Sequence, residues 1–135
     1  MQACIVWVDY LHARVFKVSP TGIVKKVIKL NAIQHSNGHR AGNFKISEEN
    51  YFQDVINAIG KPPLHLLVMG SGLAKNNFQD FLEKKQKNKL YKCLVGLVKI
   101  ADLSDNQILK ASRQFFKKYS LYNSNQMLAL ESKDR

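Results

Sequence analysis

The spacing of apolar positions in the first thirty residues predicts three short strands joined by tight turns. Residues 3–8 form an almost unbroken apolar run, which is typical of a strand covered on both faces. Residues 13–18 alternate between the two faces of a strand, and residues 23–30 form a third apolar-rich run. The turns at 9–12 and 19–22 are too short for a crossover, so neighbouring strands are expected to be antiparallel.

From residue 47 onward the spacing predicts amphipathic helices that alternate with short strands. Ser47 is expected to cap the first helix, directly before two acidic residues, and Ser104 and Gln107 form a capping box before the third. Strands are expected at residues 64–69 and 93–100. The apolar helix faces are expected to be Phe52, Val55, Ile56 and Ile59, then Ala74, Phe78, Phe81 and Leu82, then Ile108, Ala111, Phe115 and Tyr119. The order β-β-β-α-β-α-β-α predicts an α/β fold with a mixed five-stranded sheet and helices on its faces.

The chain length indicates one domain, expected over residues 1–122, followed by a polar C-terminal tail at 123–135. Apolar runs fall short of the roughly 20 residues of a membrane helix, and the first residues do not resemble a secretion signal. A cytoplasmic protein without a membrane partner is therefore expected. Cys4 and Cys93 lie in apolar runs and are expected to be buried thiols, although their number alone permits a disulfide.

The net charge of +11 indicates a polyanionic partner. Residues 61–135 hold 14 of the 21 basic side chains and 6 of the 10 acidic ones. The positions expected to contact RNA phosphates are Lys84, Lys85, Lys87, Lys89 and Lys92, together with Lys110, Arg113, Lys117 and Lys118. Tyr91, Tyr119 and Tyr122 lie close to them in sequence and offer rings on which unpaired bases can stack. The alternative is a solvated face that serves solubility.

Two glycine-containing segments are further candidates for anion contact. The stretch from 31 to 46 is polar and aperiodic, and its candidate functional residues are His35, Gly38, His39, Arg40 and Gly42. The turn Gly70, Ser71 and Gly72, with Lys75 behind it, precedes a helix whose free N–H groups favour anions. A surface loop and a tight packing turn, respectively, are the simpler interpretations.

Carboxylates and histidines raise two weaker alternatives. Asp9, at the end of the first strand, suits a metal-dependent nuclease, with Asp54, Asp102 and Asp105 as the available helpers. His35 and His39 with Asp9 give an incomplete metal-ligand set. Asp9 is more simply a turn residue, and no cofactor or metal is expected.

Several segments, taken in order, resemble the middle domain of archaeal and eukaryotic class I peptide-chain release factors and of Pelota. They are residues 5–9 (IVWVD), 13–16 (ARVF), 66–75 (LLVMGSGLAK), 95–98 (VGLV) and 101–105 (ADLSD). The match extends from about residue 3 to 120 and is closer still to small stand-alone bacterial translational machinery proteins. The resemblance implies a ribonuclease H-like topology and association with the ribosome or its RNA.

One departure from that family bears on catalysis. Release factors carry Gly-Gly-Gln in the loop after the third strand, whereas residues 37–43 here are NGHRAGN. The resemblance therefore does not extend to peptidyl-tRNA hydrolysis.

The sequence favours a non-catalytic RNA- or ribosome-binding protein of translation or ribosome rescue. The alternatives are a metal-dependent nuclease, a residual peptidyl-tRNA ester hydrolase, and a binding module for an acidic protein. The sequence does not decide between a monomer and a homodimer.

Overall fold

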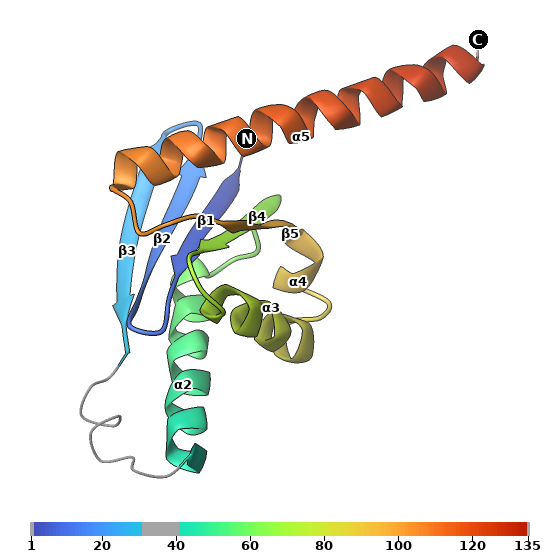
Figure 1. The fold of residues 1–135 in the computed structure, drawn as a ribbon. Coiled ribbons are helices and arrows are strands. Elements are labelled where there is room, and N and C mark those ends of the chain that lie inside the picture. Colours follow the sequence, from blue (N-terminus) through green and yellow to red (C-terminus); the bar gives the residue numbers. More distant parts are fainter. Residues whose placement is uncertain (1, 31–40, 135) are drawn as a thin grey trace. The chain divides into compact units, whose positions relative to one another are not determined.

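The computed structural model describes the backbone of residues 2–30 and 41–134, and the side chains of residues 2–30 and 47–120. It divides into two compact units, residues 1–102 and 103–135. The first unit contains β1 (Ala3–Val8), β2 (His12–Ser19), β3 (Gly22–Lys29), α2 (Ala41–Ile59), β4 (His65–Gly70), α3 (Ala74–Lys85), α4 (Leu90–Cys93) and β5 (Leu94–Lys99). The second unit contains the helix α5 (Asp105–Asp134). Figure 1 shows these elements coloured along the chain.

The five strands form one mixed sheet in the order β3-β2-β1-β4-β5. The first three strands pair as an antiparallel meander, in which Trp7 lies opposite Arg14 and Ala13 lies opposite Ile28. The strands β4 and β5 join on the other side of β1, both in the parallel direction. The predicted α/β class and mixed five-stranded sheet are therefore confirmed.

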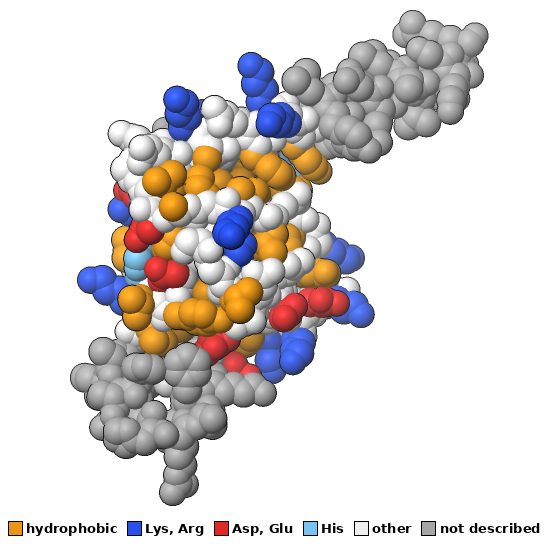
Figure 2. Space-filling view, viewed as in Figure 1, with side chains coloured by type: hydrophobic (Ala, Val, Ile, Leu, Met, Phe, Trp, Pro, Cys, Tyr) orange, Lys and Arg blue, Asp and Glu red, His pale blue; other side chains and the backbone are white. Residues whose placement is uncertain are grey.

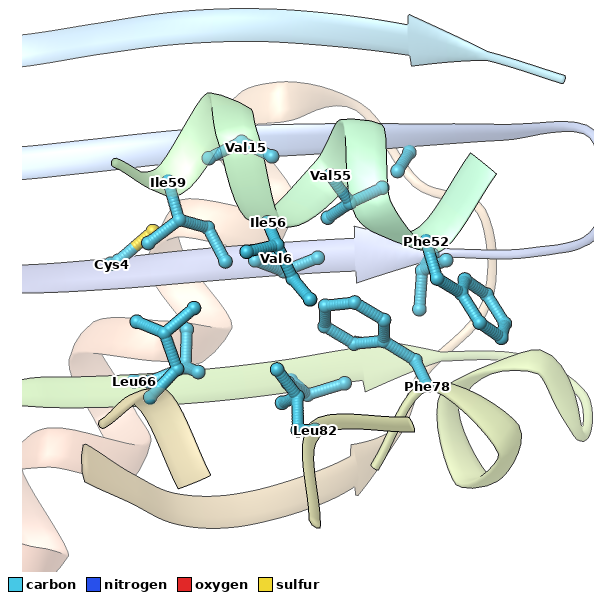
Figure 3. Close-up of a cluster of buried hydrophobic side chains, with 14 of the residues drawn as sticks. Cys4, Val6, Val15, Phe52, Val55, Ile56, Ile59, Leu66, Phe78 and Leu82 are labelled. Atoms are coloured by element: carbon cyan, nitrogen blue, oxygen red, sulfur yellow. The ribbon is translucent and has the colours of Figure 1, made fainter. Parts of the chain in front are cut away.

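The apolar faces of α2 and α3 cover one face of the sheet and form the core of the first unit. Cys4, Val6 and Val8 of β1 point to this face, as expected for alternate residues of a strand. The helices α2 and α3 bring Phe52 and Phe78 together over the sheet, with ring centroids 5.3 Å apart in an edge-to-face arrangement (Figure 3). The other members of this core come from β2, α2, β4, α3 and α4, and they are Ala13, Val15, Tyr51, Val55, Ile56, Ile59, Leu66, Val68, Leu82 and Leu90.

The opposite face of the central strands is buried as well. Ile5 and Trp7 of β1, Phe16 of β2, and Leu67 and Met69 of β4 are all almost inaccessible to solvent. This double burial explains why the β1 sequence is an unbroken apolar run rather than an alternating one. The outer strand β3 differs, because Ile23, Val24 and Val27 are exposed.

The predicted start of the first helix is wrong. The helix α2 begins at Ala41 rather than after Ser47, and Ser47 is buried inside it instead of capping it. No proline interrupts residues 41–59, and a helix that has already nucleated extends by further residues at low cost. Gly42, expected in the loop, therefore belongs to the helical backbone.

The lysine-rich stretch contains a short helix that the sequence did not predict. Residues 90–93 form α4, and β5 begins one residue later than expected. Leu90 is the buried side chain that holds α4 against the core. Leu90, Tyr91 and Cys93 are too few apolar positions in this lysine-rich run to show the periodicity of a helix.

The second unit begins with the predicted capping box. The Ser104 N–H donates to Gln107 Oε1 at 3.1 Å, and the Gln107 N–H donates to Ser104 Oγ at 3.2 Å. Ile108 is buried as expected, but Ser112 and Phe116 share that face in place of Ala111 and Phe115. The helical backbone continues through residues 123–134, the stretch that the sequence assigns to a polar tail. None of the described helices is long and apolar enough to cross a membrane.

Gly70 is expected to be sensitive to substitution, because β1 approaches it closely. A Cβ atom at this position would lie 2.4 Å from the Val8 carbonyl oxygen, whereas one at Gly72 would meet nothing within 4 Å. Gly70→Ala should lower the free energy of unfolding by about 1–3 kcal/mol. The control Gly72→Ala should leave it unchanged or raise it by up to about 1 kcal/mol, since Gly72 does not have a positive φ. Urea denaturation followed by circular dichroism measures both, and equal losses would contradict the close approach.

Candidate functional site

Polar side chains from distant parts of the first unit meet at the carboxyl edge of the sheet. The parallel strands β1, β4 and β5 end there, at Val8, Gly70 and Lys99. The antiparallel strand β2 starts at the same edge with His12. Residues that follow β1 and β5 are therefore placed beside the first residues of β2.

The segment after β5 crosses this edge and is held by the sheet at three points. The Ile100 N–H donates to the Gly70 carbonyl at 2.9 Å. The Trp7 indole N–H is shared between the carbonyls of Ile100 and Ala101, at 3.3 and 3.2 Å. Arg14 then binds Asp102 through Nη2 and Oδ1 at 2.6 Å. We call residues 100–102 the crossing segment.

Arg14 occupies an unusual position for a charged side chain, because it is almost completely buried on a central strand. Its guanidinium carbon lies 5.0 Å from the centre of the Trp7 ring, which provides a cation–π contact. The Asp102 carboxylate, which is half exposed, supplies the opposite charge. The alternation of residues 13–18 predicted which face Arg14 occupies, but not its partner, because Asp102 is 88 positions away in sequence.

Asp9 shapes the turn between β1 and β2 and lies beside His12. Its Oδ1 atom accepts hydrogen bonds from the N–H groups of Leu11 and His12, both at 2.8 Å. The same oxygen is 3.6 Å from His12 Nδ1, while His12 Nε2 is 4.0 Å from Asp102 Oδ2. We call Asp9, His12 and Asp102 the edge cluster. On the face seen in Figure 2, a histidine is bordered by acidic side chains.

The neighbouring helices support the same turn. The Tyr51 hydroxyl donates to the Asp9 carbonyl at 2.9 Å, which ties α2 to the turn. Burial, with a smaller contribution from Asp9, raises the pKa of Tyr51, so its hydroxyl remains a donor. Asn77 of α3 donates to the Tyr10 hydroxyl at 2.7 Å. The backbone around the edge cluster is thus fixed from two sides.

The structure brings together part of the carboxylate set considered for a nuclease. Asp9 and Asp102 share the edge cluster, whereas Asp54 is exposed on α2 and Asp105 belongs to the second unit. His12, which lies between the two carboxylates, was not singled out from the sequence. The sequence assigned His12 to the turn at 9–12, whereas it is the first residue of β2. The register that sets Trp7 opposite Arg14 places His12 at the edge of the sheet.

The turn at Gly70, Ser71 and Gly72 forms contacts within the protein. The Lys75 ammonium is buried and donates to the Gly72 carbonyl at 2.5 Å and to Asn76 Oδ1 at 3.3 Å. The first residues of α3 contribute no side-chain cap. Lys75 therefore satisfies the turn that precedes its own helix, and binding of an external anion here stays a prediction.

The lysines of the first unit line the end of α3, the following turn and α4. All five side chains are exposed, and we call them the lysine segment: Lys84, Lys85, Lys87, Lys89 and Lys92. Figure 2 shows Lys and Arg side chains gathered on the side where α3 and α4 lie, with acidic side chains beside them.

The described basic side chains of α5 are exposed. Lys110, Arg113 and Lys117 follow one another at helical spacing, and all three are exposed, as is Lys118. The loop candidates His35, Gly38, His39 and Arg40 lie outside the described residues. Tyr122 also lies outside the described side chains.

Both cysteines are free thiols. Cys4 is fully buried under α2, and burial raises the pKa of its thiol to about 12. Burial also raises the pKa of Cys93. Neither sulfur is poised as a nucleophile, because a reactive cysteine requires a lowered pKa.

The fold is shared with archaeal proteins of known structure. The structure superposes on Pelota from Archaeoglobus fulgidus over 84% of this chain, with a TM-score of 0.59 and 16% sequence identity. It superposes on Pelota from Thermoplasma acidophilum over 75% of this chain, with a TM-score of 0.52 and 19% identity. It superposes on an archaeal translation termination factor over 93% of this chain, with a TM-score of 0.51 and 14% identity. The resemblance inferred from the sequence is confirmed at the level of the fold.

This chain spans less than half of each of those proteins. It covers 31% and 28% of the two Pelota chains and 42% of the termination factor. No protein-family model matches the sequence, and no curated protein matches it.

The Arg14–Asp102 pair is expected to stabilise the first unit. Asp102→Asn removes the charge that balances the buried guanidinium, so the free energy of unfolding should fall by about 1–3 kcal/mol, less than for a fully buried pair. Asp54→Asn, on the exposed face of α2, is the matched control and should change it by less than about 0.5 kcal/mol. Urea denaturation measures both. An unchanged free energy of unfolding in Asp102→Asn would contradict this expectation and would mean that Arg14 is adequately solvated without its partner.

Proposed function

We propose that this chain is a non-catalytic domain that binds RNA, with the ribosome as its target, in translation or ribosome rescue. The observation that carries the proposal is the exposed lysine segment on a fold shared with Pelota and a translation termination factor. Neither half of that observation is sufficient alone, because a fold does not determine a function and a basic surface binds many polyanions.

The composition of the lysine segment supports phosphate binding. Between Lys84 and Lys92 there is no acidic residue, and each lysine ammonium reaches solvent. The acidic residues Asp80 and Glu83 lie just before it on α3 and leave the segment with a clear positive excess. Exposed ammonium groups gain affinity for RNA by releasing the counterions condensed on its phosphates.

An aromatic side chain lies among these charges and offers a base contact. Tyr91 lies between Lys89 and Lys92 and is partly buried against the core, so its ring is held at the surface rather than free. A tyrosine ring fixed in this way can stack on an unpaired base. In the second unit, Lys110, Arg113 and Lys117 form a further exposed basic row that offers phosphate contacts of its own.

The non-catalytic part of the proposal rests on two observations. Residues 37–43 do not contain the Gly-Gly-Gln that the resemblance associates with peptide release. In the described part of the chain, Asp9 and Asp102 are the carboxylates that meet at the sheet edge, and Arg14 already neutralises one of them. Two-metal nucleases need more carboxylate charge than this arrangement provides.

Ribosome co-sedimentation across a salt series tests the binding proposal. The affinity should fall steeply with salt, and the triple variant Lys84→Glu, Lys85→Glu and Lys87→Glu should bind more weakly at every salt concentration. Its log–log salt slope should be smaller by about one for each phosphate contact that is lost.

A second triple variant distinguishes RNA contacts made by the lysine segment from the effect of the protein's overall positive charge. Lys26→Glu, Lys29→Glu and Lys61→Glu change the net charge by the same amount at exposed positions outside the lysine segment. This control should bind nearly as well as the unmodified chain. Equal weakening by both triple variants would contradict a defined docking surface. Pull-down of an acidic protein that resists ribonuclease would favour the protein-partner alternative.

Incubation with labelled ribosomal RNA tests the absence of catalysis. The RNA should stay intact in the presence of Mg²⁺ or Mn²⁺, since the carboxylate set for two ions is incomplete. Cleavage by the unmodified chain that disappears in Asp9→Asn would overturn this part of the proposal and favour the nuclease. Cleavage that persists in Asp9→Asn would identify a contaminating ribonuclease.

A further inference from the structure

We infer that the edge cluster binds one divalent transition-metal ion of the Zn²⁺ type. This site is independent of the RNA proposal and uses other residues. Its three side chains come from the end of β1, the start of β2 and the crossing segment after β5.

The distances between the donor atoms suit a single ion. Asp9, His12 and Asp102 each offer one ligand atom, and these atoms all lie within 4.8 Å of one another. Bonds from Zn²⁺ to nitrogen and oxygen are about 2.0–2.2 Å, so donors on one ion are roughly 3–4 Å apart. Small rotations of side chains that are a quarter to a half exposed would close the difference.

The donor types select the class of metal. Imidazole nitrogen and carboxylate oxygen are both ligands of Zn²⁺, and the imidazole favours Zn²⁺ and ions of similar character, such as Co²⁺. Ca²⁺ and Mg²⁺ prefer oxygen ligands alone. The exposed side of the cluster leaves room for water in the remaining coordination positions.

Neighbouring groups already orient all three ligands. The N–H groups of Leu11 and His12 hold one oxygen of Asp9, which leaves its other oxygen available. Arg14 holds Oδ1 of Asp102, while Oδ2 faces His12. The Trp7 ring stacks on the imidazole, with centroids 5.3 Å apart and an angle of 26° between the planes. Such outer partners lower the cost of ordering ligands and are a regular feature of metal sites.

The local charge fits one ion and not two. The two carboxylates and the Arg14 guanidinium leave one net negative charge, and an imidazole that ligates an ion adds none. One divalent ion changes this to one net positive charge, whereas a second ion would meet strong repulsion. A bound ion would tie the crossing segment to the β1–β2 turn.

The single tryptophan provides the measurement. Trp7 is the one Trp in the chain, and its ring contacts the proposed ligand His12. Titration of the metal-free full-length protein with Co²⁺ should quench tryptophan fluorescence and saturate at one equivalent. Zn²⁺, which does not quench, should displace Co²⁺, restore the fluorescence and raise the melting temperature.

Variants assign the ion to the edge cluster. His12→Ala should lower the Co²⁺ affinity by more than the ~10–100-fold that loss of an orienting partner costs. The control His35→Ala/His39→Ala removes two other histidines and should retain the affinity of the unmodified chain. Circular dichroism of each variant verifies that it is folded.

Three results would overturn the inference. They are the absence of saturable quenching, full affinity in a folded His12→Ala variant, and loss of affinity in the His35→Ala/His39→Ala control. If His12→Ala does not fold, Asp9→Asn replaces it, with the visible absorption of bound Co²⁺ as the second readout. Unchanged absorption in that variant would count equally against the site.

Discussion

The path of the chain after β5 depends on two side chains of the sheet, Trp7 and Arg14. They lie opposite each other on β1 and β2, and they bind the carbonyls and the carboxylate of the crossing segment. A buried guanidinium is costly unless it is paired, so Asp102 has to lie at this edge. Its position then brings it to His12 and Asp9, and the edge cluster exists because the arginine is satisfied in this way.

Local sequence patterns predicted most of the fold, but they did not predict contacts between residues that are far apart in the sequence. The strand alternation, the tight turns and the Ser104–Gln107 capping box are properties of neighbouring residues. The structure retains them, with turns at 9–11 and 20–21 in place of the predicted 9–12 and 19–22. The start of α2 was wrong because Ser47, a good cap by type, is buried in a longer helix. The pairing of Arg14 with Asp102 joins residues 88 positions apart, and no local pattern reports such a contact.

For the same reason, the sequence predicted some residues of the candidate site and missed others. Exposure of the lysine segment follows from its charge alone, because ammonium groups without partners remain in water. Asp9 was recognised from its place at the end of a strand, but its neighbours His12 and Asp102 are brought to it by the strand register and by the crossing segment. The contact between Lys75 and the Gly72 carbonyl was likewise not foreseen, because a lysine behind a glycine turn suggests an anion site and gives no sign of a bond to the turn's own carbonyl.

The outer strand β3 presents an open ladder of backbone groups together with exposed Ile23, Val24 and Val27. Such a strand is a template for fibril-like stacking between molecules. Lys25, Lys26 and Lys29 interrupt it, and copies of this edge repel one another when they approach. The positive charge of β3 therefore protects the protein from aggregation at high concentration, a task that is separate from recognition of any partner.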